Sequence, residues 1–151
     1  MSNMWSLLVF VLLVVVAASS GAVFQTGAWY EALNKPTWTP PNWLFPIAWT
    51  VLYLMIAVAG WLVWKAGGGM SSAIMIWGVG LVLNALWSYF MFGRHDITLA
   101  LFDVIGLWLA TAAFIVAAWG LDVRAAYLFI PYLAWVSFAA ALNFEVWRLN
   151  S

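Results

Sequence analysis

Hydrogen-bonding side chains stand at a few places inside the long apolar stretches of this sequence. They are Trp49, Tyr53, Asn84, Asp103, Trp135, Asn143 and Glu145. In hydrocarbon such groups cost free energy unless they find partners, so they normally face other helices or a wet cavity. The chain contains no recognisable nucleophile with an adjacent base, glycine-rich phosphate loop or paired-carboxylate hydrolase site. These residues therefore indicate recognition of a ligand rather than acid–base catalysis.

The overall composition places the chain in lipid. Of its 151 residues, 68% are hydrophobic and 7% are charged, whereas a soluble domain averages roughly 45–50% and 25%. A net charge of zero without a basic cluster argues against nucleic acid as a partner. Cysteine is absent and His95 is the single histidine, which leaves no thiolate site and no multi-histidine metal site. We expect an integral membrane protein that contacts the lipid bilayer and holds no metal.

Five apolar stretches reach the length of about 20 residues that a helix needs to cross a bilayer. They are Met4–Phe24, Leu44–Trp64, Met70–Phe92, Ile97–Trp119 and Ala125–Trp147. Their apolar runs are continuous rather than alternating, which favours helices over an outer-membrane β-barrel. Short separators make consecutive spans antiparallel, so residues 1–151 are predicted to form one all-α bundle of five transmembrane helices. A signal peptide is the alternative for the first span, but a basic leading region is lacking and the apolar run is long.

The one long connection, residues 25–43, contains the stretch KPTWTPPNW with three prolines and two tryptophans. Proline fixes its own backbone and restricts the residue before it, so the segment is predicted to be a stiff loop rather than a helix. Two interpretations are open for this loop. It is either an interfacial strap with its tryptophans at headgroup depth, or a lid that holds one shape over a cavity.

The depths of the polar residues favour the lid. Counted from the side of the long loop at 1.5 Å per residue, Trp49, Asp103 and Asn84 lie roughly 8, 9 and 12 Å deep. Tyr53 and Trp135 follow at roughly 14 and 18 Å. The opposite half of the bundle has almost no such groups. Several helices with polar groups at similar depth below one stiff loop predict a pocket that opens toward that loop.

Two helical stripes combine flat aromatic, amide and small residues, as expected of a slot for a flat and largely apolar ligand. They are Gly80, Asn84, Trp87 and Ser88 on the third span, and Trp135, Ala139, Leu142 and Val146 on the fifth. Structural alternatives exist, because membrane-embedded asparagines often join helices and Asp103 can pair with Arg94. Glu145 and Arg148 are spaced to form an ion pair. Small residues four apart in the first and fourth spans allow close packing, within one protomer or in a dimer.

Three stretches of the sequence resemble one family. WYEALNKPTWTPPNWLFPIAW (29–49), NALWSYFMFG (84–93) and PYLAWVSFAAALNFEVWRLN (131–150) are similar to the TspO/MBR family. These are the tryptophan-rich sensory proteins of bacteria, relatives of the mitochondrial translocator protein or peripheral benzodiazepine receptor. The resemblance implies a five-helix membrane protein, commonly a homodimer. It also implies a pocket under the first loop that binds porphyrins and isoquinoline-carboxamide or benzodiazepine-type ligands.

The resemblance further implies roles for single residues. Trp49 and Asn84 match positions that make polar contacts to ligands. Trp135 matches a tryptophan implicated in light-dependent porphyrin breakdown, and Ala139 matches a position where a larger residue alters ligand binding. A bacterial membrane is indicated, inner or outer. Lys and Arg residues divide three against two between its sides, so the positive-inside rule does not orient the bundle.

One departure from the family concerns sterols. The sterol-recognition stretch on the fifth helix is matched here by Leu142 and Arg148, but Phe144 stands where the family pattern expects tyrosine. Without the phenolic hydroxyl we do not expect a sterol-specific contact.

Three functions are compatible with these residues. The leading hypothesis is a receptor or sensor for tetrapyrroles such as protoporphyrin IX and haem-type molecules, with porphyrin as a ligand and no required cofactor. Its expected ligand contacts are Trp38, Trp49, Tyr53, Asn84, Trp87, Trp135, Ala139 and Leu142. The second hypothesis is an enzyme that degrades porphyrin in light, with Trp135 as electron donor. A transporter of porphyrin or sterol ranks last, because no internal repeat is present.

Overall fold

The computed structural model describes residues 2–151, and these residues are helical apart from short turns and one long loop. The helices are α1 (Ser2–Val23), α2 (Ala28–Glu31), α3 (Leu44–Ala66), α4 (Ser72–Ser88), η1 (Tyr89–Gly93), α5 (Ile97–Trp119) and α6 (Val123–Leu149). Five helical stretches are long and apolar enough to cross a membrane, namely Met4–Val23, Leu44–Ala66, Ser72–Gly93, Ile97–Trp119 and Val123–Leu149. The predicted all-α fold with five spans is confirmed.

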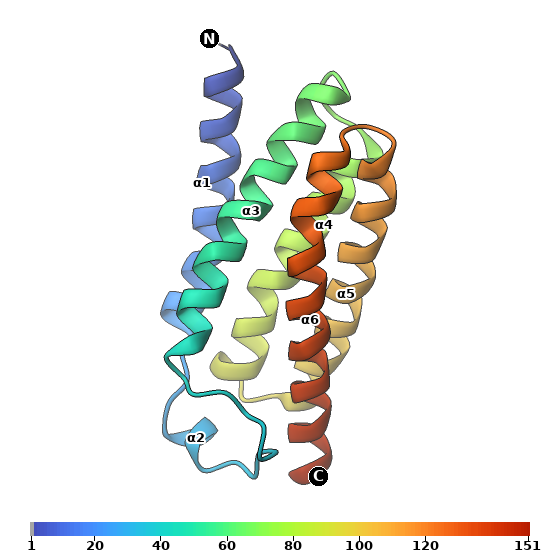
Figure 1. The fold of residues 1–151 in the computed structure, drawn as a ribbon. Helices are drawn as coiled ribbons and strands as arrows, with labels where there is room; N and C mark the ends of the chain where they lie inside the picture. The colour runs from blue at the N-terminus through green and yellow to red at the C-terminus, as the bar shows by residue number, and fades with distance from the viewer. Residues whose placement is uncertain (1) are drawn as a thin grey trace.

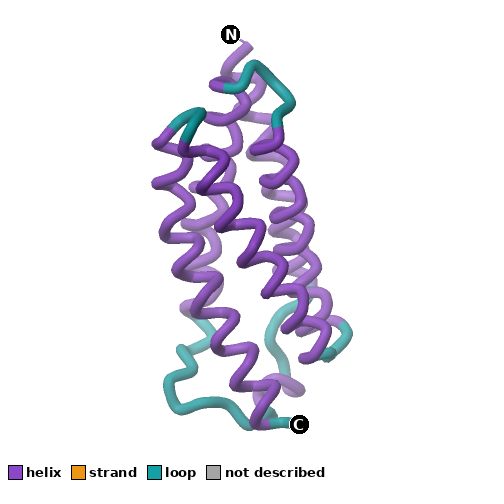
Figure 2. The backbone as a smooth tube through the Cα atoms, turned by 90° about the vertical axis from the view of Figure 1, so that its right-hand side faces the viewer, coloured by secondary structure: helices purple, strands orange, loops and turns teal. Residues whose placement is uncertain are grey.

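The long helices lie side by side and run up and down along one axis (Figure 1). The N-terminus lies at one end of the bundle, while the C-terminus and the long loop that carries α2 lie at the other (Figure 1). A view turned by 90° shows the loops gathered at the two ends (Figure 2). This arrangement follows from the short connections, because a short connection makes consecutive helices antiparallel neighbours.

Apolar side chains cover the outside of the bundle as well as its core. Val63 and Phe114 are fully buried, whereas Val16, Phe102 and Val116 are 70%, 69% and 78% exposed. A helix at the surface of a soluble protein carries polar residues on its outer face. Since the outer faces here are apolar and the backbone is hydrogen-bonded within helices, hydrocarbon is the solvent that fits this surface.

The third span differs most from its prediction. The α-helix α4 ends at Ser88, and the chain continues as the π-helical turn η1 to Gly93. At Gly93 the chain passes close to Phe24, and a Cβ atom on this glycine would lie 2.7 Å from the Phe24 ring. A side chain there would have to displace the Phe24 ring, so glycine allows this close approach.

The other spans agree with their predictions to within two residues at most positions. α5 has the predicted bounds, while α6 extends two residues further than predicted at each end. Its start is set by Asp122, whose carboxylate accepts hydrogen bonds from the backbone and side chain of Arg124 at 3.0 Å. An aspartate at the N-cap satisfies N–H groups that would otherwise lack partners, and so defines where the helix begins.

Candidate ligand-binding pocket

A cavity of about 420 Å³ lies between α1, α3 and α4, at the end of the bundle that carries the long loop. We call it the pocket, and its lining residues are Ala18, Gly21, Ala22, Phe24, Gln25, Thr26, Asn42, Phe45, Pro46, Trp49, Thr50, Tyr53, Asn84, Trp87, Ser88 and Phe92. Its volume falls in the range of about 300–1,000 Å³ that is typical of ligand sites. Most of the lining is aromatic or apolar with a few polar groups, which suits a largely apolar molecule.

Small side chains on α1 form one wall of the pocket. Ala18, Gly21 and Ala22 lie on successive turns of one helical face. On the same helix, Ser20 Oγ donates a hydrogen bond of 2.6 Å to the carbonyl of Ala85 on α4. The interpretation of these small residues as packing positions missed this wall, because a small residue that lets a helix approach and one that leaves room for a ligand look alike in sequence.

Asn84 both joins helices and borders the pocket, the two roles that the sequence analysis left open for it. Its Oδ1 accepts a hydrogen bond of 3.1 Å from Tyr53 Oη, and its Nδ2 donates one of 2.9 Å to Tyr132 Oη. The amide therefore joins α4 to α3 and α6, and Asn84 is 96% buried. Asn84 also lines the pocket, so the same amide that joins three helices contributes a polar spot to the wall.

Two tryptophans present different groups to the pocket. Trp49 stacks on Tyr53 with ring centres 5.5 Å apart, and within residues 2–151 its indole N–H has no hydrogen-bond acceptor. The indole N–H of Trp87 instead donates to Asn143 Oδ1 at 2.9 Å, and Asn143 in turn donates to the carbonyl of Ile97. Trp49 can therefore donate a hydrogen bond to a ligand, whereas Trp87 offers the surface of its ring.

The predicted contacts on α6 lie outside the pocket wall. Trp135 packs edge-on against Trp49 and Phe45 at 6.2 and 6.0 Å, so it stands one ring behind the lining. Its indole N–H is buried and has no hydrogen-bond partner among the described residues. Ala139 and Leu142 are buried between helices. Helical spacing places these residues on one stripe, but it does not say which neighbour the stripe faces.

Trp38 also lies away from the lining, on the loop. Its ring packs edge-on against Phe138 of α6 at 5.6 Å, and 46% of the side chain is exposed. The structure therefore brings together four of the eight predicted contacts, namely Trp49, Tyr53, Asn84 and Trp87.

The residues of the sterol-like stretch do not share a surface. Leu142 is buried, while Phe144 is 45% exposed and its ring lies 5.9 Å from that of Trp147. Arg148 forms an ion pair of 2.7 Å with Glu145. The ion pair anticipated from the spacing of these two residues is confirmed.

Asp103 is 94% buried, and its Oδ2 has no hydrogen-bond partner among the described residues. The alternative pairing with Arg94 is absent from the ion pairs of this part of the chain. The indole N–H of Trp108, near the middle of its span, donates a hydrogen bond to Ser137 Oγ at 2.7 Å. Residues 2–151 contain no group of three or more His, Cys, Asp or Glu side chains that could hold a metal ion.

The loop between α1 and α3, residues 24–43 and called loop 1 from here, is docked on the rest of the bundle. The ring of Trp29 stacks on His95 with ring centres 4.3 Å apart and planes 6° apart. Asn34 and Asn150, at the end of α6, exchange two hydrogen bonds of 3.0 and 2.8 Å. Loop 1 is therefore held against the turn before α5 and against the last residues of the chain.

Only part of loop 1 borders the pocket. Gln25, Thr26 and Asn42 line the pocket, whereas the prolines of KPTWTPPNW do not. Lys35 Nζ donates to the carbonyls of Tyr30 and other loop residues and stiffens this turn from within. The two ends of the loop thus border the pocket, while its proline-rich middle crosses to α6.

Comparisons with known proteins agree with this architecture. Residues 8–148 match the TspO/MBR family. The chain is 40% identical to protein CrtK of Rhodobacter capsulatus. The alignment spans 139 residues, which are 89% of this chain and 86% of that protein. Identity to the tryptophan-rich sensory protein of Cereibacter sphaeroides is 41% over 133 residues, or 88% and 84% of the two chains. The translocator protein of Homo sapiens is 39% identical over 126 residues, or 81% and 75%. The five-helix bundle and these matches over most of its length show that the chain belongs to the TspO/MBR family.

Proposed function

We propose that this membrane protein is a receptor that binds flat, largely apolar molecules of the tetrapyrrole class in the pocket between α1, α3 and α4. The observation that carries the proposal is the indole N–H of Trp49, which is unpaired within residues 2–151 in a wall that is otherwise mainly aromatic and small. An aromatic wall favours a flat ring system, and an unpaired donor favours a ligand that brings an acceptor. The names of two relatives, sensory protein and translocator protein, describe those proteins and agree with a binding role.

Recognition would divide between shape and hydrogen bonding. The ring of Trp87, fixed by its bond to Asn143, forms a flat surface for a macrocycle or a fused aromatic amide. Trp49 donates its N–H to a carboxylate or carbonyl at the edge of the ligand, and Asn84 has a second amide N–H beyond the one that it gives to Tyr132. A ligand without an acceptor at this edge would leave the Trp49 donor desolvated and unpaired, which lowers affinity.

Binding has more support than the alternatives from the sequence. Trp135, the expected electron donor for porphyrin breakdown in light, is separated from the pocket by Trp49. The lining carries no carboxylate or imidazole for proton transfer. Homodimer formation and the identity of the membrane stay predictions from the family.

Titration of protoporphyrin IX into the detergent-solubilised protein in the dark, followed by quenching of tryptophan fluorescence, tests the proposal. The parent should show saturable quenching. Trp49→Phe keeps a ring and removes the N–H, and it should weaken binding by about tenfold, the effect of losing one hydrogen bond to a charged or strongly polar group. Asn84→Leu should weaken binding as well.

Trp108→Phe is the matched control, because Trp108 has a bonded N–H outside the pocket. It removes one indole without changing the pocket, so its affinity should equal that of the parent. Quenching that rises linearly without saturation, or equal affinities of the Trp49 and Trp108 variants, would contradict the proposed site.

A further inference from the structure

A second large cavity, a groove of about 430 Å³, lies between α1, the end of α3 and the start of α4. It is at the end of the bundle opposite loop 1, where the N-terminus and the turn between α3 and α4 lie (Figure 1). We call it the α1–α4 groove, and its lining comes from residues 6–13 and 70–78 and from Trp64. It shares no lining residue with the pocket, so an inference about it does not rest on the proposed function.

The α1–α4 groove runs along the helices, from the membrane surface toward the centre of the bilayer. Ser6 and Trp64 form its outer rim, and each lies two residues inside the end of its membrane span. Leu13 and Gly78 form its inner end. Ser6 to Leu13 covers roughly 10 Å at 1.5 Å per residue, which is most of one half of a hydrocarbon core about 30 Å thick. The groove therefore has the direction and the depth of a lipid acyl chain.

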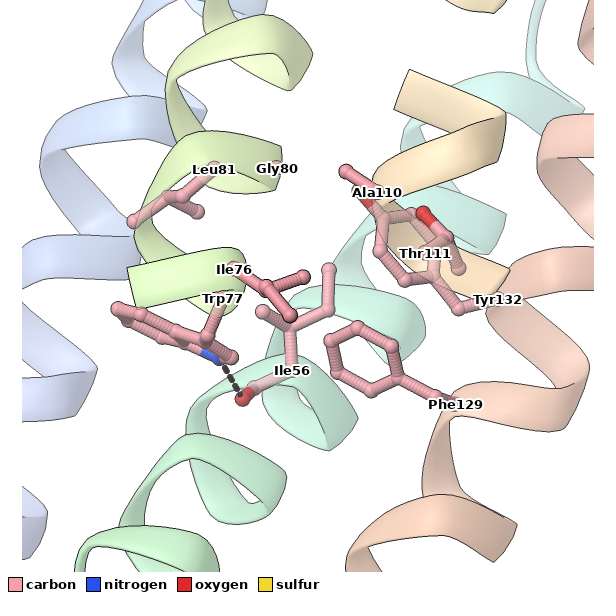
Figure 3. Close-up of a pocket in the computed structure, with 9 residues that line it drawn as sticks. All are labelled: Ile56, Ile76, Trp77, Gly80, Leu81, Ala110, Thr111, Phe129 and Tyr132. Atoms are coloured by element: carbon pink, nitrogen blue, oxygen red, sulfur yellow. Dashed lines mark hydrogen bonds between the residues drawn. The ribbon is translucent and has the colours of Figure 1, made fainter. Parts of the chain in front are cut away.

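Below its rim the α1–α4 groove is lined by apolar side chains. Two polar groups that border it are already bonded to the protein. Ser6 Oγ at the rim accepts the indole N–H of Trp61 at 3.2 Å, and the N–H of Trp77 donates to the carbonyl of Ile56 at 2.9 Å (Figure 3). Trp77 also borders a core cavity of only about 10 Å³, about the room of one water molecule, so its ring has little space to retreat. The groove is suited to a hydrocarbon chain.

The size of the groove favours a single chain over a helix from a second copy. A helix with its side chains is about 10–12 Å across, so two turns of one would fill roughly 850–1,200 Å³. The groove holds about 430 Å³. Met70 and Met75 are among its lining residues, and the flexible, unbranched side chain of methionine adapts to the shape of an acyl chain.

A cation stands beside the rim of the groove. Lys65 is in the last turn of α3, and its Nζ lies 3.8 Å from the centre of the Trp61 ring, whose N–H is bonded to Ser6. Among residues 2–151 Lys65 forms no ion pair, whereas Asp122 and Arg124, the other charged side chains at this end, pair with each other at 2.8 Å. The ends of membrane helices lie at the level of the lipid headgroups, so Lys65 is placed to meet a phosphate.

We propose that the α1–α4 groove binds one phospholipid with an anionic headgroup, its acyl chain along the groove and its phosphate beside Lys65. Apolar contact alone would select no particular lipid, because a chain that moves from the surrounding hydrocarbon into the groove gains no hydrophobic free energy. The selectivity therefore comes from Lys65. One basic side chain near the membrane surface favours anionic lipid by about fivefold.

Native mass spectrometry of the detergent-solubilised protein tests this inference, with an equimolar mixture of phosphatidylglycerol and phosphatidylcholine that have the same acyl chains. The parent should retain one lipid and favour phosphatidylglycerol about fivefold. Lys65→Gln should lose this preference, and Lys65→Arg should keep it. Arg94→Gln is the matched control, because it removes an exposed cation without an ion pair in the described part of the chain, at the opposite end of the bundle. It should keep the preference.

Gly78→Leu tests the groove itself. No atom lies within 4 Å of the position that a Cβ atom would take at Gly78, so a leucine side chain has room there and fills the inner end of the groove. The retention of both lipids should fall. Ala113→Leu adds an apolar side chain to an exposed face of α5 outside the groove, and its lipid retention should equal that of the parent. Thermal unfolding shows that each variant is folded.

Three results would overturn the inference. They are equal retention of the two lipids by the parent, a preference for phosphatidylglycerol that persists in Lys65→Gln, and unchanged lipid retention in folded Gly78→Leu. The same spectra count protomers, so a dimer fraction that falls in Gly78→Leu while lipid retention stays the same would assign the groove to contact between copies instead. The affinity for protoporphyrin IX should equal that of the parent in Lys65→Gln and Gly78→Leu, because neither residue lines the pocket.

Discussion

Gly60 on α3 packs so closely against the core that the addition of one methyl group should destabilise the bundle. A Cβ atom built there would lie 2.6 Å from Cε2 and 2.7 Å from Nε1 of Trp77, and 2.9 Å from Cδ1 of Phe10. The Trp77 ring cannot move away freely, because its N–H donates to the carbonyl of Ile56 at 2.9 Å. Phe10 also packs edge-on against it at 5.0 Å.

The size of the effect follows from three contributions. Carbon atoms in contact are about 3.5–4.0 Å apart, so Gly60→Ala must displace the Trp77 ring by roughly 1 Å. Overpacking of this kind costs about 1–3 kcal/mol, and distortion of the buried hydrogen bond to Ile56 adds about 1 kcal/mol. The higher helix propensity of alanine offsets about 1 kcal/mol of this loss of stability. The net loss is therefore about 1–3 kcal/mol, or a fall of roughly 2–12 °C in Tm for a chain of this size.

Thermal unfolding in detergent, followed by near-UV circular dichroism, measures this change. Gly78→Ala is the matched control, because no atom lies within 4 Å of the position that a Cβ atom would take there, and its Tm should equal or exceed that of the parent. Both glycines lie outside the pocket, so the affinity for protoporphyrin IX should stay the same in folded protein. A Tm for Gly60→Ala at or above that of the parent, or an equal loss in the control, would refute the packing argument.

Two further predictions concern loop 1 and the start of α6. Asn150→Ala removes both hydrogen bonds to Asn34. Each bond contributes about 0.5–1.5 kcal/mol. At the low end of that range, the loss of both should make the undocked form of loop 1 roughly fivefold more populated. Amide hydrogen exchange in loop 1 should then be faster. An unchanged exchange rate would show that these two hydrogen bonds do not hold the loop in place. Asp122→Ala should lower stability by about 0.5–2 kcal/mol at pH 7, while Asp122→Asn should lose less. The hydrogen bonds from Arg124 hold the pKa of Asp122 below its ordinary value, so its contribution is complete above about pH 4 and is lost as the pH falls through the folded-state pKa. A Tm difference between parent and Asp122→Ala that is equal at pH 7 and pH 3 would contradict this.

The spans could be predicted from the sequence because the bilayer imposes a length on every helix. The start of α5 is a good example, since Asp96 precedes a continuous apolar run. As the N-cap residue, Asp96 accepts a hydrogen bond from the backbone N–H of Leu99 with its Oδ1. The π-helical turn η1 could not be predicted in the same way. Its last residue, Gly93, packs closely against Phe24, a residue far away in sequence, and nothing in the local composition indicates this contact.

Depth along the helices predicted the site more accurately than helical stripes did. Trp49, Tyr53 and Asn84 have similar depths and meet in the pocket, because depth follows directly from the rise of a helix. Ala139 and Leu142 share a stripe that faces the core instead. Periodicity shows which residues lie together on a helix, whereas the rotation of the helix and the identity of its neighbours are set by packing between helices.

The two sides of the pocket have different physical character. α3, which Asn84 joins to α4, has 39% of its most apolar stretch buried, whereas α1 has 17%. The hydrogen-bonded side is held by groups that cannot leave their partners without loss of buried hydrogen bonds, because lipid offers them none in exchange. α1 contributes small side chains and few polar bonds, so its displacement disturbs little besides dispersion contacts. In the proposed function, the hydrogen-bonding groups that a ligand must match therefore lie on α3 and α4. The small side chains of α1 set the space available to the ligand.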